Sequence, residues 1–86
     1  EVETEEQVRE ALAAGVDIIM LDNMAPEEMA AMVKLVDGRA LVEASGNITA
    51  ENIRAVAATG VDIISVGGLT HSVKALDISL EVNQIY

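Results

Sequence analysis

The 86-residue sequence has the length of one small domain, and its composition excludes several classes of function. Fifteen acidic and five basic side chains give a formal net charge of −10, which disfavours binding to nucleic acids and anionic membrane surfaces. Hydrophobic residues make up 51% of the chain but include one aromatic side chain, so we expect an aliphatic core. The sequence has no cysteine, and no apolar run approaches the roughly 18 residues of a membrane span. We therefore expect a soluble, cytoplasmic protein that binds neither nucleic acid nor a membrane.

Hydrophobic periodicity divides the first part of the chain into a strand, a helix and a second strand. Residues 1–3 have the pattern of a strand. Thr4, followed three residues later by Gln7, predicts the N-terminal cap of a helix that ends at Gly15. Residues 16–21 form a nearly continuous aliphatic run, which is typical of a parallel strand covered on both faces.

The same alternation continues through two further helices. Pro26 suits the first turn of a helix that ends at Gly38, and residues 40–42 form a short strand. Thr49 is expected to open a third helix, and residues 61–66 form the next strand. The resulting order, β-α-β-α-β-α-β with short connections, predicts a parallel sheet with right-handed crossovers.

An internal repeat favours a barrel-like α/β fold. Residues 4–19 and 49–64 match at nine of sixteen aligned positions, a period of two βα units. Chance similarity between two amphipathic βα units is the alternative. We predict that residues 1–75 form half of a TIM-like α/β barrel, a parallel (βα) half-barrel with about four strands and three to four helices. Residues 76–86 are assigned to a C-terminal amphipathic strand and a tail, because residues 76–82 alternate apolar and polar side chains.

Carboxylates stand at the ends of three predicted strands, where ligands of parallel α/β sheets bind. These are Glu3, Asp22 and Glu43. Such oxygen ligands could hold sugar hydroxyls or a magnesium ion, although a carboxylate at a strand end also serves solubility alone. Asp22 is the best candidate because it ends a buried apolar run, where a charge is otherwise costly.

Two small turns at this same edge could bind a phosphate group. Ser45-Gly46-Asn47 and Gly67-Gly68 each follow a predicted strand. Backbone N–H groups in such turns can cradle a phosphate monoester, although both could be ordinary βα loops. His71, the only histidine, follows in the same predicted loop, where it would either donate to a phosphate or cap a turn.

Basic residues are scarce at this edge. A site for a multiply anionic substrate needs several cations. Arg9, Lys34 and Arg54 lie within predicted helices, and Arg39 lies at the start of a strand. Only Lys74 follows the last loop at this edge.

Several motifs together resemble one enzyme family. Leu21-Asp22-Asn23, then Glu43-Ala44-Ser45-Gly46-Asn47, then residues 61–72 with Val66-Gly67-Gly68-Leu69-Thr70-His71-Ser72, and finally residues 75–80 occur in this order. They resemble quinolinate phosphoribosyltransferase, also called carboxylating nicotinate-nucleotide pyrophosphorylase. The resemblance covers nearly the whole chain up to Val82. It matches only the carboxy-terminal part of that family, the second half of its α/β barrel.

The resemblance implies a reaction and roles for particular residues. In that family, quinolinate and phosphoribosyl pyrophosphate give nicotinate mononucleotide, pyrophosphate and carbon dioxide, with magnesium. Glu3 and Asp22 would hold the ribose hydroxyls or magnesium, and Ser45-Gly46-Asn47 and Gly67-Gly68 would bind the 5′-phosphate, with His71 nearby. The cations that the family uses for quinolinate and pyrophosphate come from earlier strands and an amino-terminal domain, which these 86 residues do not include.

Two departures from the family pattern concern individual residues. Gly68 stands where alanine is usual, which loosens that turn. Ala25 replaces a serine or threonine that would cap a helix.

The sequence therefore predicts a fragment or engineered half-barrel of this enzyme, inactive alone and without a cofactor of its own. A self-associating scaffold without catalytic function, or a small phosphate-binding α/β module, is the alternative. We expect phosphate or a phosphorylated ribose to bind weakly, since the net charge opposes anions. Cutting a barrel exposes strand edges and interior side chains, so the expected partner is a second copy of the chain or the missing amino-terminal half of the barrel.

Overall fold

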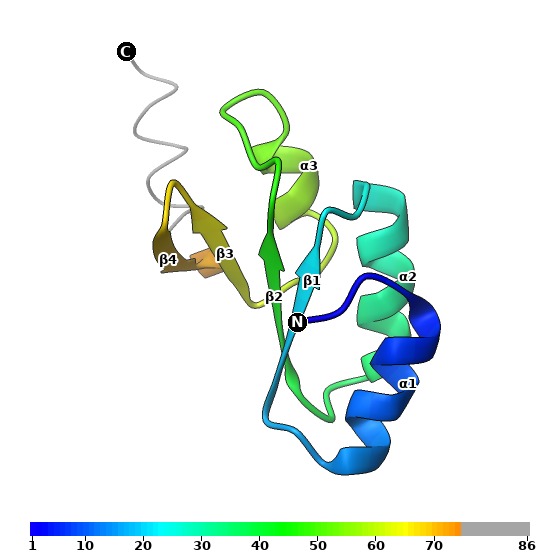
Figure 1. The fold of residues 1–86 in the computed structure, drawn as a ribbon. Helices are drawn as coiled ribbons and strands as arrows, with labels where there is room; N and C mark the ends of the chain where they lie inside the picture. Colours follow the sequence, from blue (N-terminus) through cyan, green and yellow to red (C-terminus); the bar gives the residue numbers. More distant parts are fainter. Residues whose placement is uncertain (75–86) are drawn as a thin grey trace.

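The structure, a computed structural model, describes residues 1–74. The sequence prediction for residues 76–86 lies outside the described residues. Helices and strands alternate along most of the described chain (Figure 1): α1 (Glu5–Ala14), β1 (Ile18–Asp22), α2 (Pro26–Val36), β2 (Leu41–Ser45), α3 (Ile53–Ala57), β3 (Ile63–Val66) and β4 (Leu69–Ser72).

The four strands form one sheet in the order β1-β2-β3-β4. Strands β1, β2 and β3 are parallel, whereas β4 is antiparallel to β3. Val2 makes an isolated parallel bridge with Leu21, so the predicted first strand is present as a single bridge beside β1. This open, mostly parallel α/β sheet with three described helices confirms the predicted half-barrel.

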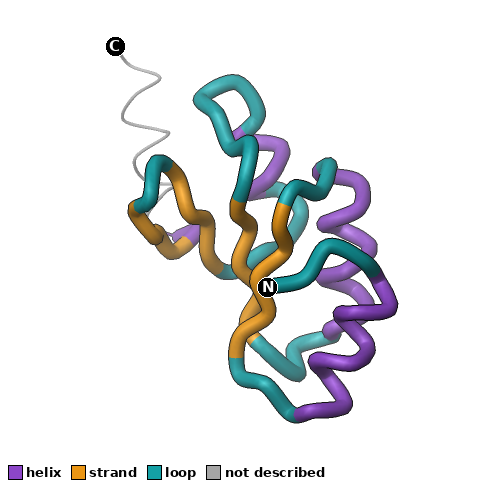
Figure 2. Tube along the Cα trace, viewed as in Figure 1, coloured by secondary structure: helices purple, strands orange, loops and turns teal. Residues whose placement is uncertain are grey.

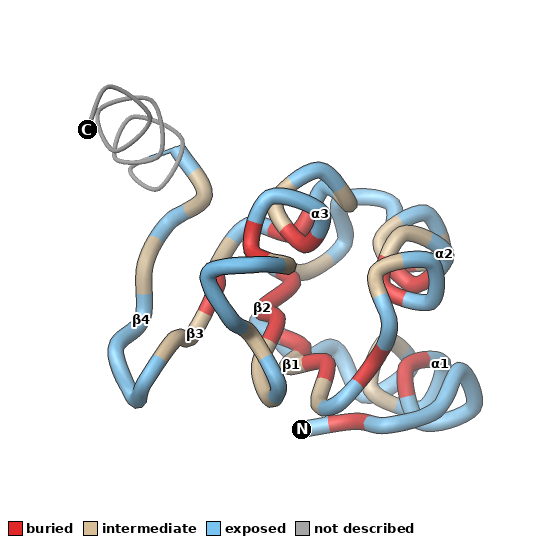
Figure 3. Tube along the Cα trace, turned by 90° about the horizontal axis from the view of Figure 1, so that it is seen from above, coloured by how far each residue is buried: buried red, intermediate tan, exposed pale blue. Residues whose placement is uncertain are grey.

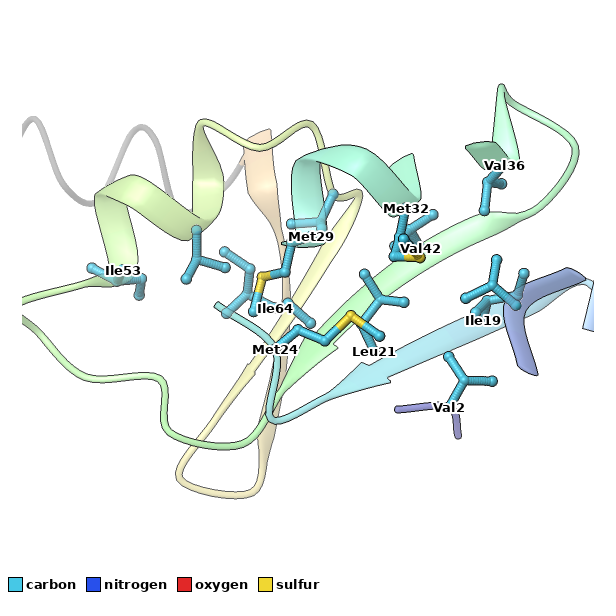
Figure 4. Packing of buried hydrophobic residues seen from close by; sticks show 14 residues of the cluster. Val2, Ile19, Leu21, Met24, Met29, Met32, Val36, Val42, Ile53 and Ile64 are labelled. Carbon is cyan, nitrogen blue, oxygen red and sulfur yellow. The ribbon is translucent and has the colours of Figure 1, made fainter. Parts of the chain in front are cut away.

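The helices all lie on one face of the sheet (Figures 1 and 2), and the view from above shows the same separation of layers (Figure 3). Strand residues at alternate positions, such as Ile19, Leu21 and Ile64, are buried beneath the helices. Figure 4 shows how side chains from the strands meet methionines from α2 and the loop before it. The buried core is entirely aliphatic or methionine: Val2, Val8, Ile19, Leu21, Met24, Met29, Met32, Val36, Val42, Ala44, Ile53, Val56, Val61 and Ile64.

Local signals set the helix ends. The hydroxyl of Thr4 accepts a hydrogen bond from Gln7 N at 3.2 Å, which confirms the predicted cap of α1. Gly15 ends α1 with a left-handed φ of 74°. At the start of α2, Ala25 makes no side-chain capping hydrogen bond.

Two element boundaries differ from the prediction. The third helix starts at Ile53, not Thr49, because residues 50–52 form turns. Strand β2 extends through Glu43 to Ser45, beyond the predicted end at Val42, since its pairing with β1 continues to Ser45.

Residues 69–72 were predicted as a loop but form strand β4. Val66 pairs with Leu69, so Gly67 and Gly68 are a two-residue hairpin turn. Both have left-handed φ angles, 56° and 82°, as a type I′ turn requires. The two glycines therefore reverse the chain rather than lead into a βα loop.

Within residues 1–74, no helix is both long and apolar enough to span a bilayer.

Candidate functional site at the carboxyl edge of the sheet

Three polar residues form a row at the carboxyl ends of neighbouring strands. Asp22 and Ser45 pair in register as the last residues of β1 and β2. Glu3 follows Val2, which bridges to Leu21, and therefore lies beside Asp22. Val2 and Leu21 are buried under the helices, so by strand alternation Glu3, Asp22 and Ser45 lie on the opposite, uncovered face. The structure thus places the two carboxylates predicted to bind ribose near Ser45, the first residue of the turn predicted to bind phosphate.

Gly46 lies tightly against the end of β1. A Cβ atom at this position would be 2.7 Å from Oδ1 of Asn23 and 2.8 Å from Oδ1 of Asp22. The φ angle of Gly46 is 81°, which side-chain-bearing residues rarely adopt. Only glycine fits here without displacing Asp22 or Asn23. The turn therefore packs closely against the side chain of Asp22.

Asparagine side chains connect the loops on this edge. Nδ2 of Asn47 donates to Oδ1 of Asn23 at 2.8 Å, and Asn23 N donates to the carbonyl oxygen of Ser45 at 3.1 Å. Nδ2 of Asn52 donates to the carbonyl oxygen of Asn47 at 2.7 Å. The loop after β1 and the loop after β2 are therefore linked by direct hydrogen bonds.

A surface pocket of about 220 Å³ lies between these two loops. Its lining combines asparagine amides with apolar side chains and includes no basic residue. Among the described residues it is lined by Asn23, Met24, Ala25, Pro26, Met29, Gly46, Asn47, Ile48, Asn52 and Val56.

The second predicted phosphate turn lies away from this pocket. Gly67, Gly68 and His71 are not among the lining residues. A Cβ atom added at Gly67 or Gly68 would meet nothing within 4 Å, so these glycines serve the turn conformation rather than a close approach within the described chain. His71 is half-buried in β4 opposite Ile64, which places it on the helix-covered face of the sheet.

Glu43 lies inside strand β2 and not at its end. It pairs in register with Met20 on one side and Ile63 on the other, inside β2, and is 8% exposed. By strand alternation it lies on the uncovered face, two residues before Ser45.

The described carboxylates do not form a metal cage. Residues 1–74 hold no group of three or more histidine, aspartate or glutamate side chains placed to bind a metal ion. Glu3, which follows the bridge at Val2, and Asp22, the last residue of β1, do fit the chemistry of magnesium, which proteins often hold through one or two carboxylates together with substrate oxygens.

The basic side chains lie outside the pocket beside Gly46. Arg9 forms an ion pair with Glu5 at 3.1 Å, one turn away on α1. The guanidinium of Arg39 donates to the carbonyl oxygens of Val36 and Leu35 at the end of α2. None of the five basic residues lines the pocket beside Gly46.

Sequence reasoning missed Asn23 and Asn52 as site residues. A local signal existed for Asn52, because Thr49 and Asn52 exchange backbone-to-side-chain hydrogen bonds in the same three-residue spacing as Thr4 and Gln7. The contact of Asn23 with Asn47 joins residues 24 apart in sequence, and no local pattern predicts it.

A mostly parallel, open α/β sheet with carboxylates and a tight glycine turn at its carboxyl edge has the arrangement of part of an α/β barrel, a fold that binds its ligands at this edge. Residues 1–81 match the family described as "Quinolinate phosphoribosyl transferase, C-terminal domain". The chain belongs to this family, which confirms the resemblance seen in the sequence.

Individual relatives agree with this assignment. The chain is 55% identical over 82 residues to the probable nicotinate-nucleotide pyrophosphorylase [carboxylating] of Bacillus subtilis, covering 95% of this chain and 28% of the relative. It is 44% identical to the protein of that name from Methanocaldococcus jannaschii, covering 95% of this chain and 31% of that relative. The crystal structure of nicotinate-nucleotide pyrophosphorylase from Ehrlichia chaffeensis superposes with a TM-score of 0.74 at 42% identity, covering 77% of this chain and 24% of that one. The chain therefore spans less than a third of the length of these relatives.

Proposed function

We propose that this chain binds the ribose 5-phosphate part of a phosphoribosyl substrate, as part of a quinolinate phosphoribosyltransferase that makes nicotinate mononucleotide for NAD biosynthesis. The observation that carries the proposal is the packing of Gly46 against Asp22 and Asn23. This packing places a glycine turn with backbone N–H groups beside a carboxylate, and a ligand with both a phosphate and sugar hydroxyls needs both groups.

Each group at the edge has a task that its chemistry suits. Within residues 1–74, the backbone N–H groups of Gly46 and Asn47 enter no hydrogen bond and are available to the 5′-phosphate. Anchoring the phosphate positions the anomeric carbon of the ribose. The carboxylates of Glu3 and Asp22 would accept hydrogen bonds from ribose hydroxyls and favour positive charge that develops at that carbon. Magnesium held by these carboxylates would neutralise charge on substrate oxygens.

Gly67, Gly68 and His71 remain a proposed second contact to the phosphate. This proposal is supported by the family motif around them. The turn at Gly67-Gly68 is exposed, and a Cβ atom at either glycine would meet nothing within 4 Å, so packing within the described chain does not explain the glycines. Gly67 and Gly68 follow β3, so a ligand bound at Gly46 would contact them only if it also extends past the end of β2 to the end of β3.

The test is a comparison of two glycine variants. Gly46→Ala places a methyl group against Asp22 and Asn23, whereas Gly38→Ala faces nothing within 4 Å at a similar φ of 76°. We expect Gly46→Ala to raise the Kd for ribose 5-phosphate at least about fivefold, the worth of one lost hydrogen bond, and Gly38→Ala to leave it unchanged. Equal effects of the two variants in calorimetric titrations would refute the proposed site.

We further propose that these 86 residues do not catalyse the transfer alone. Quinolinate and pyrophosphate are both multiply charged anions, and no basic residue lines the pocket. Incubating the purified chain with quinolinate, phosphoribosyl pyrophosphate and magnesium should give no nicotinate mononucleotide above the uncatalysed background. Product formed at an enzyme-like rate would contradict this proposal.

A second candidate function, self-association as a scaffold, has one observation in its favour. Ile18 and Leu41 pair in register on the face of the sheet that no described helix covers, and they are 50% and 48% exposed. Burying such a surface against a second copy, or against the rest of a barrel, would remove apolar area from water.

A further inference from the structure

We propose that the side-chain amide of Asn23 is a positioning group that holds the Ser45-Gly46-Asn47 turn in the conformation that receives phosphate. The inference rests on the proposed function, because it assigns a cause to the geometry of the same site. Asn23 itself need not touch the ligand.

The contacts of Asn23 with the turn come from both its backbone and its side chain. Asn23 N donates to the carbonyl oxygen of Ser45 at 3.1 Å, and Oδ1 accepts from Nδ2 of Asn47 at 2.8 Å. The same Oδ1 lies 2.7 Å from the point where a Cβ of Gly46 would be. Asn23 is therefore hydrogen-bonded to Ser45 and Asn47 and occupies the space that a side chain at position 46 would need.

The backbone around this contact is held in conformations that need support. Asn23 and Asn47 both have φ angles of 56°, and Gly46, the residue before Asn47, has a φ of 81°. Left-handed backbone is unfavourable for residues with a side chain, although asparagine tolerates it better than most. Two such asparagines joined by one hydrogen bond stabilise each other's conformation.

The turn is fixed from its other side as well. Nδ2 of Asn52 donates to the carbonyl oxygen of Asn47, while Oδ1 of Asn52 accepts from Thr49 N at 2.8 Å. Asn47 is thus held by its side chain and its carbonyl group. Its backbone N–H and that of Gly46 stay unengaged within residues 1–74, which leaves these two donors for a ligand.

A double-mutant cycle tests whether Asn23 and Asn47 act on the turn through the hydrogen bond that joins their side chains. The variants are Asn23→Gly, Asn47→Gly and the combination, since glycine accepts the left-handed backbone while the side-chain bond is removed; the backbone freedom that glycine adds is the effect that a control variant must measure. Asp37→Gly is the matched control, because Asp37 also has a left-handed φ, 50°, but caps α2 near the amino-terminal ends of the strands.

Two readouts are measured on each variant of the 86-residue chain. The first is 15N relaxation of the Gly46 and Asn47 backbone amides without ligand, and the second is the Kd for ribose 5-phosphate. Each single change should lower the order parameters of these two amides and raise the Kd about fivefold. The double variant should be no worse than the weaker-binding single variant, and Asp37→Gly should match the unmodified chain in both readouts.

The outcomes separate the inference from the function it rests on. If the unmodified chain binds no ribose 5-phosphate, the proposed function fails, and the relaxation data alone then decide the role of Asn23. If the single effects multiply in the double variant, the two side chains act independently and the inference is wrong. Order parameters that stay unchanged in Asn23→Gly would overturn it as well.

Discussion

Asp17 and Asp62 occupy equivalent positions in the internal repeat, but their side chains have different environments. Oδ2 of Asp62 accepts a hydrogen bond at 2.9 Å from Val42 N, in the core-facing part of β2. Asp17 is exposed and makes no side-chain hydrogen bond within residues 1–74. The repeat thus contains one carboxylate that joins two strands and one that remains at the surface.

We predict that Asp62→Ala destabilises the fold, because it leaves a backbone N–H of Val42 without a partner where Val42 is 2% exposed. An unpaired buried donor costs about 1–3 kcal/mol. Urea unfolding followed by circular dichroism measures the free energy of unfolding. Asp17→Ala is the matched control, and a loss of stability as large in Asp17→Ala would show that the hydrogen bond is not the cause.

Local pattern was enough to select Asp22, at the end of an apolar run, and Gly46, in a polar turn, as candidate residues. The structure places the two beside each other, and their roles toward a ligand stay predictions. The bond between Asn23 and Asn47 was not identified, because it depends on the register of β1 against β2. A side-chain contact across two strands is fixed only once the strands are paired.

At the scale of elements, helices α1 and α2 differ in how their first turns are satisfied. The hydroxyl of Thr4 caps α1, whereas Ala25 offers no side-chain acceptor to the N–H groups at the start of α2. Pro26 lacks an N–H group, so it removes one unsatisfied donor, but the following donors remain.

We predict that Ala25→Ser stabilises the chain and Thr4→Ala destabilises it, each by about 1 kcal/mol. Ala25 already has the extended φ and ψ of a capping residue, −69° and 154°, so serine fits without rearrangement. Thermal unfolding of the two variants should shift the Tm in opposite directions. A Tm shift of the same sign in both would contradict the capping explanation.

Elements α1, β1 and α2 could be predicted because two signals in the sequence agree. The spacing of the hydrophobic residues marks each element, and Gly15 and Gly38 mark the ends of the two helices. The hairpin of β3 and β4 was not predicted, although two glycines between two short strand-forming segments are a known signal for a two-residue turn. Residues 69–72 were assigned to a loop because they follow a predicted strand at the edge of the sheet where the loops of parallel α/β folds bind ligands. The late start of α3 at Ile53 was also missed. The hydrogen bond from Asn52 N to the hydroxyl of Thr49 closes a turn before the helix, and Thr49 was predicted to be the helix cap itself.

At the scale of the whole molecule, the sheet has one face covered by helices and one face that no described element covers (Figure 3). The uncovered face carries both the exposed Ile18 and Leu41 pair and the carboxylate row. Association through this face would not need to block the carboxyl edge, because Ile18 and Leu41 lie at the opposite ends of β1 and β2 from Asp22 and Ser45.

We predict that the isolated 86-residue chain forms a dimer through this face. Apolar area removed from water contributes roughly 25 cal/mol per Å², while the charge of −10 on each copy opposes larger assemblies. Sedimentation equilibrium over a hundredfold range of concentration should show a monomer–dimer equilibrium, and Ile18→Lys with Leu41→Lys should shift it to monomer. A mass that stays at 9.1 kDa at every concentration would contradict the prediction.

The most direct measurement of the central claim is a map of backbone amide shifts over the whole chain during titration with ribose 5-phosphate. The account predicts that Gly46 and Asn47 shift first and furthest, at millimolar ligand, because the net charge keeps affinity low. Shifts at Gly67 and Gly68 in the same titration would add the second turn to the site. Shifts confined to the helix-covered face, or no shifts at millimolar ligand, would contradict the claim that the carboxyl edge of this sheet binds a phosphorylated sugar.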